Sequence, residues 1–200
     1  TNVRLENYET ALEQLTELYA LRCRVSGENH QETMDTMRRI ADVHSDMGLH
    51  RKALKIHKQL YQSAYELFGP EDLYTITQLG SLAGSYYNLR KYKKAKSLCQ
   101  NQYTLLCQQL GETHPDTIGA FHNTALCNKN LKNYQEALVQ CEKSYDQFCQ
   151  TLGNTHARTI AVLGTIGSIY KNQGNQEKAL ELYGDEEPEY LIDKLMYKVC

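Results

Sequence analysis

The stretch 110–138, LGETHPDTIGAFHNTALCNKNLKNYQEAL, decides how this chain folds. Its Gly111 recurs as Gly27, Gly69 and Gly153, at a constant interval of 42 residues. The same interval separates three further ladders of one residue type: Ala11, Ala53, Ala95, Ala137 and Ala179; Thr33, Thr75, Thr117 and Thr159; Tyr19, Tyr61, Tyr103 and Tyr145. A period of this length, kept without an insertion, indicates an array of repeated structural units.

Each unit is predicted to contain two α-helices, called here the first helix and the second helix. Apolar or small residues recur in the first helix at the spacing of one helical face, as in the segment 79–86. A short polar turn follows, and the second helix opens near the repeated alanine. It is expected to end at the repeated glycine in a left-handed turn. Such a pair cannot bury its apolar faces alone, so neighbouring units must stack.

Small residues recur inside the first helices, at Ala41, Ala83, Ala125 and Gly167. They are expected to let the second helix approach closely. Combined with an aromatic three residues later and an aromatic-x-x-Ala start of the second helix, this pattern resembles the tetratricopeptide repeat. The matching stretches are LAGSYYNLRKYKKA, IGSIYKNQGNQEKA and ADVHSDMGLHRKA.

The usual tetratricopeptide period is about 34 residues. The 42-residue unit with its LGETHPDT joint is similar to the variant found in kinesin light chains and nephrocystin-type proteins. The Asn-Asn pair and the acidic residues usual on the first helices of kinesin light chains are mostly missing. The resemblance implies an all-α fold, a right-handed α-solenoid of stacked antiparallel helix pairs.

The period divides residues 1–183 into one array. It consists of a lone second helix at 6–25 and repeats at 26–67, 68–109, 110–151 and 152–183. The segment 184–200 departs from the pattern, and three interpretations stay open. It is a capping helix, an acidic tail that docks in a groove of its own or another molecule, or a sequence that is not native to the protein.

Composition restricts the function. The net charge of −2 argues against a nucleic-acid partner. No apolar run is long enough for a membrane span, so no membrane partner is expected. Seven cysteines without a Cys-x-x-Cys pair fit a reducing compartment, and we expect a cytoplasmic protein. Nucleotide-binding, zinc-protease and serine-hydrolase motifs are missing, so neither an enzyme nor a cofactor is predicted.

The histidines and cysteines repeat in phase with the units. His30, His114 and His156 share one position, with Asp72 in the fourth. Because equivalent positions of stacked helices lie about 10 Å apart, these residues cannot share a metal ion, and we interpret them as helix caps or as packing residues of the joint between units. The cysteines are interpreted as packing residues for the same reason, since neighbours one unit apart exceed the Cα distance of a disulfide.

The resemblance implies a concave groove, lined by the first helices, that holds a peptide or protein segment. The residues predicted to face it are Arg38, Arg39, Asp42, Asp46, Ser81, Tyr87, Asn88, His122, Asn123, Lys129, Asn130, Thr165, Ser168, Lys171 and Asn172. Asn88, Asn130 and Asn172 form a ladder that either clamps a ligand backbone or serves locally at helix ends. The later units offer lysines without acids, so a ligand with an acidic segment is expected.

The predicted function is therefore a non-enzymatic protein-interaction scaffold. The alternative is a regulatory module in which 185–200 docks in a groove or interface, by autoinhibition or self-association. An enzyme using Cys and His would require a thiol of strongly lowered pKa.

Overall fold

The structure, a computed structural model, describes the backbone of residues 2–183 and the side chains of residues 7–179. Within this range it consists of nine α-helices without a strand, so the all-α class is confirmed. The helices are α1 (Asn2–Ser26), α2 (Gln31–Asp46), α3 (His50–Phe68), α4 (Leu73–Asn88), α5 (Tyr92–Leu110), α6 (Pro115–Asn130), α7 (Tyr134–Leu152), α8 (Ala157–Asn172) and α9 (Gln176–Tyr183).

The first helices α2, α4, α6 and α8 have 16 residues each, and the second helices α3, α5 and α7 have 19. The structure therefore keeps the period found in the sequence. The predicted lone second helix is α1, which begins at Asn2 rather than at residue 6. The predictions for the segment 184–200 lie outside the described residues.

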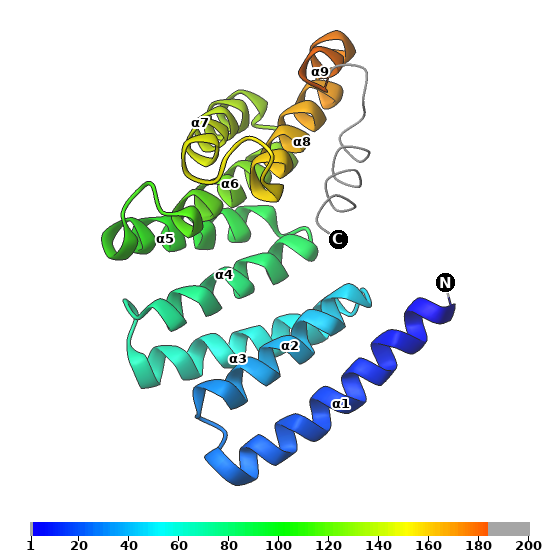
Figure 1. Ribbon diagram of the computed structural model, residues 1–200, viewed down its shortest axis with the longest axis vertical. Coiled ribbons are helices and arrows are strands. Elements are labelled where there is room, and N and C mark those ends of the chain that lie inside the picture. Colours follow the sequence, from blue (N-terminus) through cyan, green and yellow to red (C-terminus); the bar gives the residue numbers. More distant parts are fainter. Residues whose placement is uncertain (1, 184–200) are drawn as a thin grey trace. The chain divides into compact units, whose positions relative to one another are not determined.

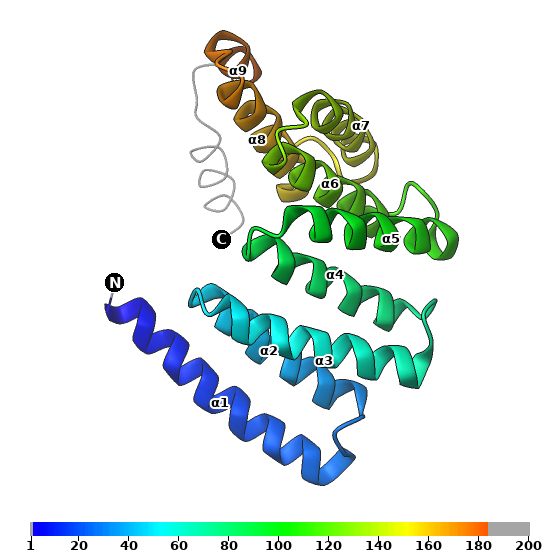
Figure 2. The same cartoon turned by 180° about the vertical axis from the view of Figure 1, so that it is seen from behind.

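The chain divides into two compact units that meet inside α5, between Leu98 and Cys99. Within unit 1, α1 packs on α2, α2 on α3, and α3 on α4 (Figures 1 and 2). Within unit 2, α6 packs on α7 and α8, α7 packs on α8, and α8 on α9. The second helices α3 and α7 are thus each covered on two sides by first helices, as the stacking of incomplete units requires.

Histidine caps the first helices. The Nδ1 atoms of His30, His114 and His156 each accept a hydrogen bond from the backbone N–H two residues on, at 3.4, 3.2 and 3.1 Å. Asp72 does the same for α4 at 2.8 Å, and Pro115 occupies the first turn of α6. The capping interpretation is confirmed, and it accounts for a position that is His in three repeats and Asp in one.

The repeated glycine ends each second helix with a backbone that other residues avoid. Gly69 has φ 87° and ψ 169°, and Gly153 has φ 88° and ψ 162°. The positive φ was predicted, but ψ lies far from the left-handed helical value. This region is open essentially to glycine alone, which explains the strict ladder better than an ordinary left-handed turn does.

The small-residue ladders form the contacts between helices. The repeated alanines Ala53, Ala95, Ala137 and Ala179 are at most 1% exposed, and Ala41 and Ala125 of the first helices are fully buried. In unit 2, Phe148 and Cys141 of α7 pack in one cluster with residues of both α6 and α8. The threonine ladder is buried as well, and Thr75 donates a hydrogen bond from Oγ1 to the Ala64 carbonyl at 3.0 Å.

We expect Gly153→Ala to lower the free energy of unfolding by about 1–3 kcal/mol, because alanine cannot adopt this backbone without strain. A Cβ at this position would meet no atom within 4 Å, so the loss would be a backbone effect. Gly119→Ala in α6, where a Cβ also has space, is the control and should raise stability by up to about 1 kcal/mol. Urea denaturation measures both, and equal effects of the two substitutions would contradict this account.

Replacing His114 tests the histidine cap. His114→Ala should cost about 0.5–2 kcal/mol of unfolding free energy, since the N–H of Asp116 loses its acceptor. His114→Asn keeps a side-chain acceptor and should retain most of the stability in the same urea titration. If asparagine were as harmful as alanine, His114 would act through packing instead.

Candidate functional site

The candidate binding surfaces are the faces of the first helices, which in unit 1 are α2 and α4. On α2, Arg38 is held by its own helix. Its Nη1 donates to Asp42 Oδ2 at 3.1 Å, and its Nε lies 3.8 Å from Asp35 Oδ1. Asp42 also lies 3.4 Å from Nε2 of the buried His57 on α3. The charges of Arg38 and Asp42 are therefore largely balanced within unit 1.

Two further predicted residues of α2, Arg39 and Asp46, are exposed and make no hydrogen bond or ion pair with another described side chain. On α4, Ser81 is half-buried. Tyr87 packs edge-on against Tyr92, with ring centroids 5.4 Å apart. Asn88 donates from Nδ2 to Ser45 Oγ of α2 at 2.8 Å, so this amide joins two first helices.

In unit 2, α6 and α8 make two contacts of the same kind. His122 Nε2 lies 3.0 Å from Oγ1 of the buried Thr165. The Thr165 hydroxyl donates to the Ala161 carbonyl, so the imidazole is the donor in this pair. Lys129 donates from Nζ to Ser168 Oγ at 3.4 Å. The structure thus brings together four predicted residues, in two pairs.

The remaining predicted residues of unit 2 are Asn123, Asn130, Lys171 and Asn172. Asn130 is half-buried and donates from Nδ2 to the Leu126 carbonyl of its own helix at 2.9 Å. Asn123, Lys171 and Asn172 are exposed. Of the asparagine ladder, Asn88 therefore bridges helices and Asn130 bonds locally. The assignment of the ladder to a ligand stays a prediction.

Burial shifts the titration of this surface. It lowers the pKa of His122 to about 4, with a smaller contribution from the nearby charge of Lys129. Burial also lowers the pKa of Lys129. His122 is consequently neutral at physiological pH. Lys129 is a partly desolvated ammonium that donates to a hydroxyl, although a carboxylate would be its strongest partner.

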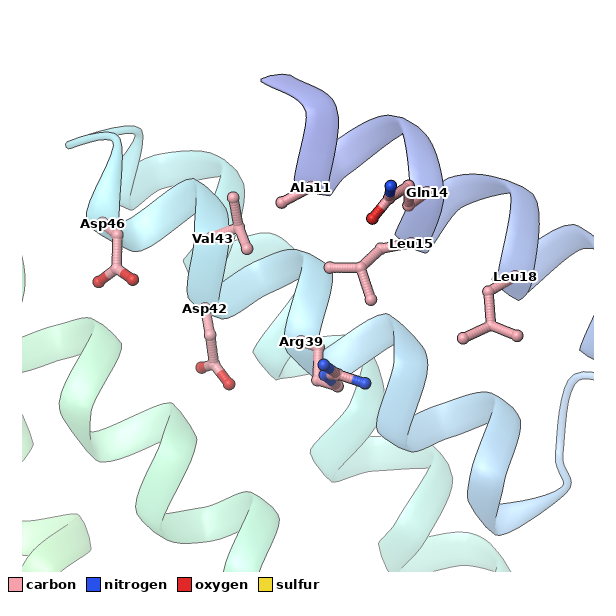
Figure 3. Close-up of a pocket in the computed structure, with 8 residues that line it drawn as sticks. All are labelled: Ala11, Gln14, Leu15, Leu18, Arg39, Asp42, Val43 and Asp46. Atoms are coloured by element: carbon pink, nitrogen blue, oxygen red, sulfur yellow. The ribbon is translucent and has the colours of Figure 1, made fainter. Parts of the chain in front are cut away.

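A hollow of about 470 Å³ lies between α1 and α2 (Figure 3). Its lining includes three predicted residues, Arg39, Asp42 and Asp46. The other lining residues are Val43 of α2 and Ala11, Gln14, Leu15 and Leu18 of α1. Sequence reasoning assigned none of the α1 residues to a site, because α1 was treated only as the start of the array.

Sequence reasoning also missed a pair of thiols. Cys99 and Cys127 are 4% and 1% exposed. Their mutual hydrogen bond, together with burial, raises the pKa of Cys99 far above its usual value. Burial raises the pKa of Cys141 to about 12. These are the shifts of packed thiols and the opposite of those that make a nucleophile.

The described residues offer no site for a metal ion. In that part of the chain no group of three or more His, Cys, Asp or Glu side chains is arranged to hold a metal ion. The described cysteines are free thiols. None of the helices in the same part is both long and apolar enough to cross a membrane.

The pKa of His122 predicts how stability depends on pH. The unfolded chain binds a proton near the ordinary pKa of 6.5, whereas the folded chain does so only near 4. Stability should therefore fall as the pH is lowered through this window. We expect the imidazole resonance of His122 to titrate near pH 4 by NMR. His122→Gln should flatten the decline in stability over the same range. A midpoint near 6.5 would show that the ring is open to water.

Comparisons with solved structures place the fold. A kinesin-light-chain-like protein of nearly identical repeats from Podosopora anserina matches with a TM-score of 0.72 and 17% identity, over 98% of this chain and 90% of that one. BtubC from P. vanneervenii matches with a TM-score of 0.67 and 17% identity, over 96% and 80%. A Rap protein complexed with Competence and Sporulation Factor matches with a TM-score of 0.76 and 17% identity, over 98% of this chain and 53% of that one.

These similarities confirm the predicted α-solenoid class. No protein of curated function matches the sequence. The family model described as tetratricopeptide repeat matches residues 1–66 and 120–185, which is more than half of the chain. On this match, and on the stacked helix pairs of the structure, the chain belongs to the tetratricopeptide repeat family.

Proposed function

We propose that the chain is a non-enzymatic protein-interaction scaffold that binds a peptide or partner segment on the faces of its first helices. Repeat arrays of this family offer extended surfaces for such ligands. Support also comes from the similar Rap protein, which was solved with a second molecule, Competence and Sporulation Factor, bound to it.

Lys129 carries the assignment of a ligand class. Its ammonium is partly desolvated, and it donates a hydrogen bond to the hydroxyl of Ser168 at 3.4 Å. The structure gives Lys129 no carboxylate partner among the described residues. A ligand carboxylate would form a charge-assisted hydrogen bond with Lys129 at a low desolvation penalty. Much of the desolvation of the ammonium has already occurred on folding.

The surroundings of Lys129 favour the same ligand. Lys171 lies one period further along, on α8, and is exposed. Asn130 and Asn172 follow these lysines in sequence, and the predicted binding positions of unit 2 include no acidic residue. We therefore assign an acidic peptide segment to unit 2.

Unit 1 offers a weaker site for an acidic ligand. Arg38 is already paired with Asp42 at 3.1 Å and lies near Asp35. A ligand carboxylate would have to compete with two carboxylates of the same helix. The exposed Asp46 adds further negative charge to this face. Charge thus assigns the acidic part of a ligand to α6 and α8.

A fluorescent probe peptide of alternating glutamate and tyrosine tests the proposal by anisotropy. Lys129→Met keeps the apolar stem and should weaken binding about tenfold, which corresponds to about 1.4 kcal/mol. Lys171→Glu should weaken it similarly. Lys143→Glu, the same charge change on the second helix α7, is the control and should have no effect.

A second probe with glutamine in place of glutamate should bind far more weakly, and added salt should lower the affinity of the acidic probe. If both probes bound equally, or if Lys143→Glu acted like Lys171→Glu, acidic recognition by the first helices would be refuted. Thermal melts of all variants separate a lost contact from a loss of folding.

A further inference from the structure

Tyr86 of α4 lies between two lysines that belong to different second helices. The residue is only 4% exposed, and its phenolic oxygen accepts hydrogen bonds from the side chains of Lys58 of α3 and Lys94 of α5. The Nζ atom of Lys94 also lies 4.6 Å from the centre of the Tyr86 ring. All three residues belong to unit 1, and both lysines are exposed. Two ammonium groups therefore converge at the surface on one neutral oxygen.

The charge of these two ammonium groups is not balanced by acidic neighbours. Among the described residues, neither Lys58 nor Lys94 forms an ion pair with a carboxylate. The helix α3 contains no acidic residue before Glu66, and none occurs between Asp72 and Glu112. The lysines consequently repel each other, and an anion bound between them would replace this repulsion by attraction.

The titration of Tyr86 reports the positive potential at this point. Burial alone would raise the pKa of its phenol, as burial does for Tyr61 and Tyr103. The hydrogen bonds and charges of Lys94 and Lys58 instead lower the pKa of Tyr86 below its ordinary value. The two lysines thus favour negative charge at a group that is otherwise buried, and the same potential favours a bound anion.

The equivalent places in the other repeats lack this pair of lysines. The positions of Lys58, Tyr86 and Lys94 are occupied there by Thr16, His44 and Lys52, by Gln100, Asn128 and Glu136, and by Glu142, Tyr170 and Lys178. In the last set the Nζ atom of Lys178 lies 5.8 Å from the centre of the Tyr170 ring, but Glu142 stands in the position of Lys58. Of the four sets, the one at Tyr86 has a lysine on both sides.

We propose that Lys58, Tyr86 and Lys94 bind a phosphate monoester, in the form of a phosphorylated side chain of a partner protein. Such a group carries a charge of about −1.5 to −2 at neutral pH and three acceptor oxygens. Two ammonium groups match this charge, and they form charge-assisted hydrogen bonds with the oxygens. Arg51 and Lys55 are exposed on the same face of α3 as Lys58, seven and three residues earlier. They extend the positive surface toward acidic residues that flank the phosphate.

Other anionic ligands match the site less well. A carboxylate carries one negative charge, whereas two ammonium groups converge here. A nucleic acid spreads its charge over successive phosphodiesters and is bound by cations that follow its backbone. A lipid surface contacts the most exposed side chains, whereas the phenol at the centre of this site is buried. The convergence of two cations on one point favours a single dianionic group.

This site is independent of the acidic-peptide surface proposed for unit 2. Its lysines belong to the second helices α3 and α5, whereas Lys129 and Lys171 belong to the first helices α6 and α8. Lys171→Glu is therefore expected to leave phosphate binding unchanged. Failure of one proposal would leave the other intact.

A glycine-rich peptide with blocked termini and one phosphoserine as its only charged group is the probe. In an NMR titration of the full chain, we expect shifts of the backbone amides within 51–58 and 86–94. Serine in place of phosphoserine should abolish binding, and glutamate should weaken it at least tenfold. Affinity for the phosphoserine peptide should also fall as the pH is lowered through about 6, where the phosphate takes up a proton.

The chain with Lys58→Gln and Lys94→Gln should bind the phosphoserine peptide at least tenfold more weakly. Its melting temperature should not fall, because the two substitutions remove a repulsion. Tyr86→Phe keeps the ring and should weaken binding several-fold. Lys178→Gln, the same charge change at the equivalent position of α9, is the control and should have no effect.

Four results would overturn the inference. They are equal affinity for the phosphoserine and glutamate peptides, unchanged binding by the chain with both lysines replaced, shifts confined to unit 2, and absence of binding. Stronger binding of vesicles that contain phosphorylated phosphatidylinositol would assign the site to a membrane. Stronger binding of a single-stranded RNA would assign it to a nucleic acid. Either outcome would also refute recognition of a phosphorylated protein.

Discussion

Every helix of this chain depends on its neighbours to cover its apolar face. A pair of helices of 16 and 19 residues buries too little surface to be stable alone. The alanines where helices cross are needed because another backbone lies in close contact with them. Ala125 and Ala137 are both fully buried, which a bulkier residue would prevent. The glycine joints and histidine caps serve the same requirement, because they end one helix and start the next within a few residues.

Much of the fold could be predicted from the sequence because the period is kept without insertion. Ladders of Gly, Ala and Thr fix the helix order, and His114-Pro115-Asp116 marks a helix start by its own chemistry. The backbone conformation of the repeated glycines was harder to predict from the sequence. A glycine that recurs at the same position indicates a positive φ. The ψ of 162° at Gly153 depends instead on the position of the following helix.

The candidate site could be predicted only in part, and the reason is geometric. Helical periodicity assigns His122, Lys129, Thr165 and Ser168 to one face, but it does not say that they pair across helices. Those pairs join positions 43 and 39 residues apart, one residue more than the period and three residues fewer. The Cys99–Cys127 contact escaped for a similar reason, since only cysteines in the same phase were compared. The hollow beside α1 could not be predicted because a sequence period does not show where the side chains of α1 and α2 leave a space.

The hydrogen bonds between successive first helices have a consequence for how such an array can change. Ser168 accepts a hydrogen bond from Lys129, and Ser45 accepts one from Asn88, so side chains of the proposed binding surface also join adjacent repeats. A substitution that changes ligand binding at these positions would then also change the contact between adjacent repeats. A repeat transplanted into another scaffold would carry its specificity only together with the hydroxyl of its neighbour. The smallest exchangeable module is therefore a pair of adjoining repeats, not a single one.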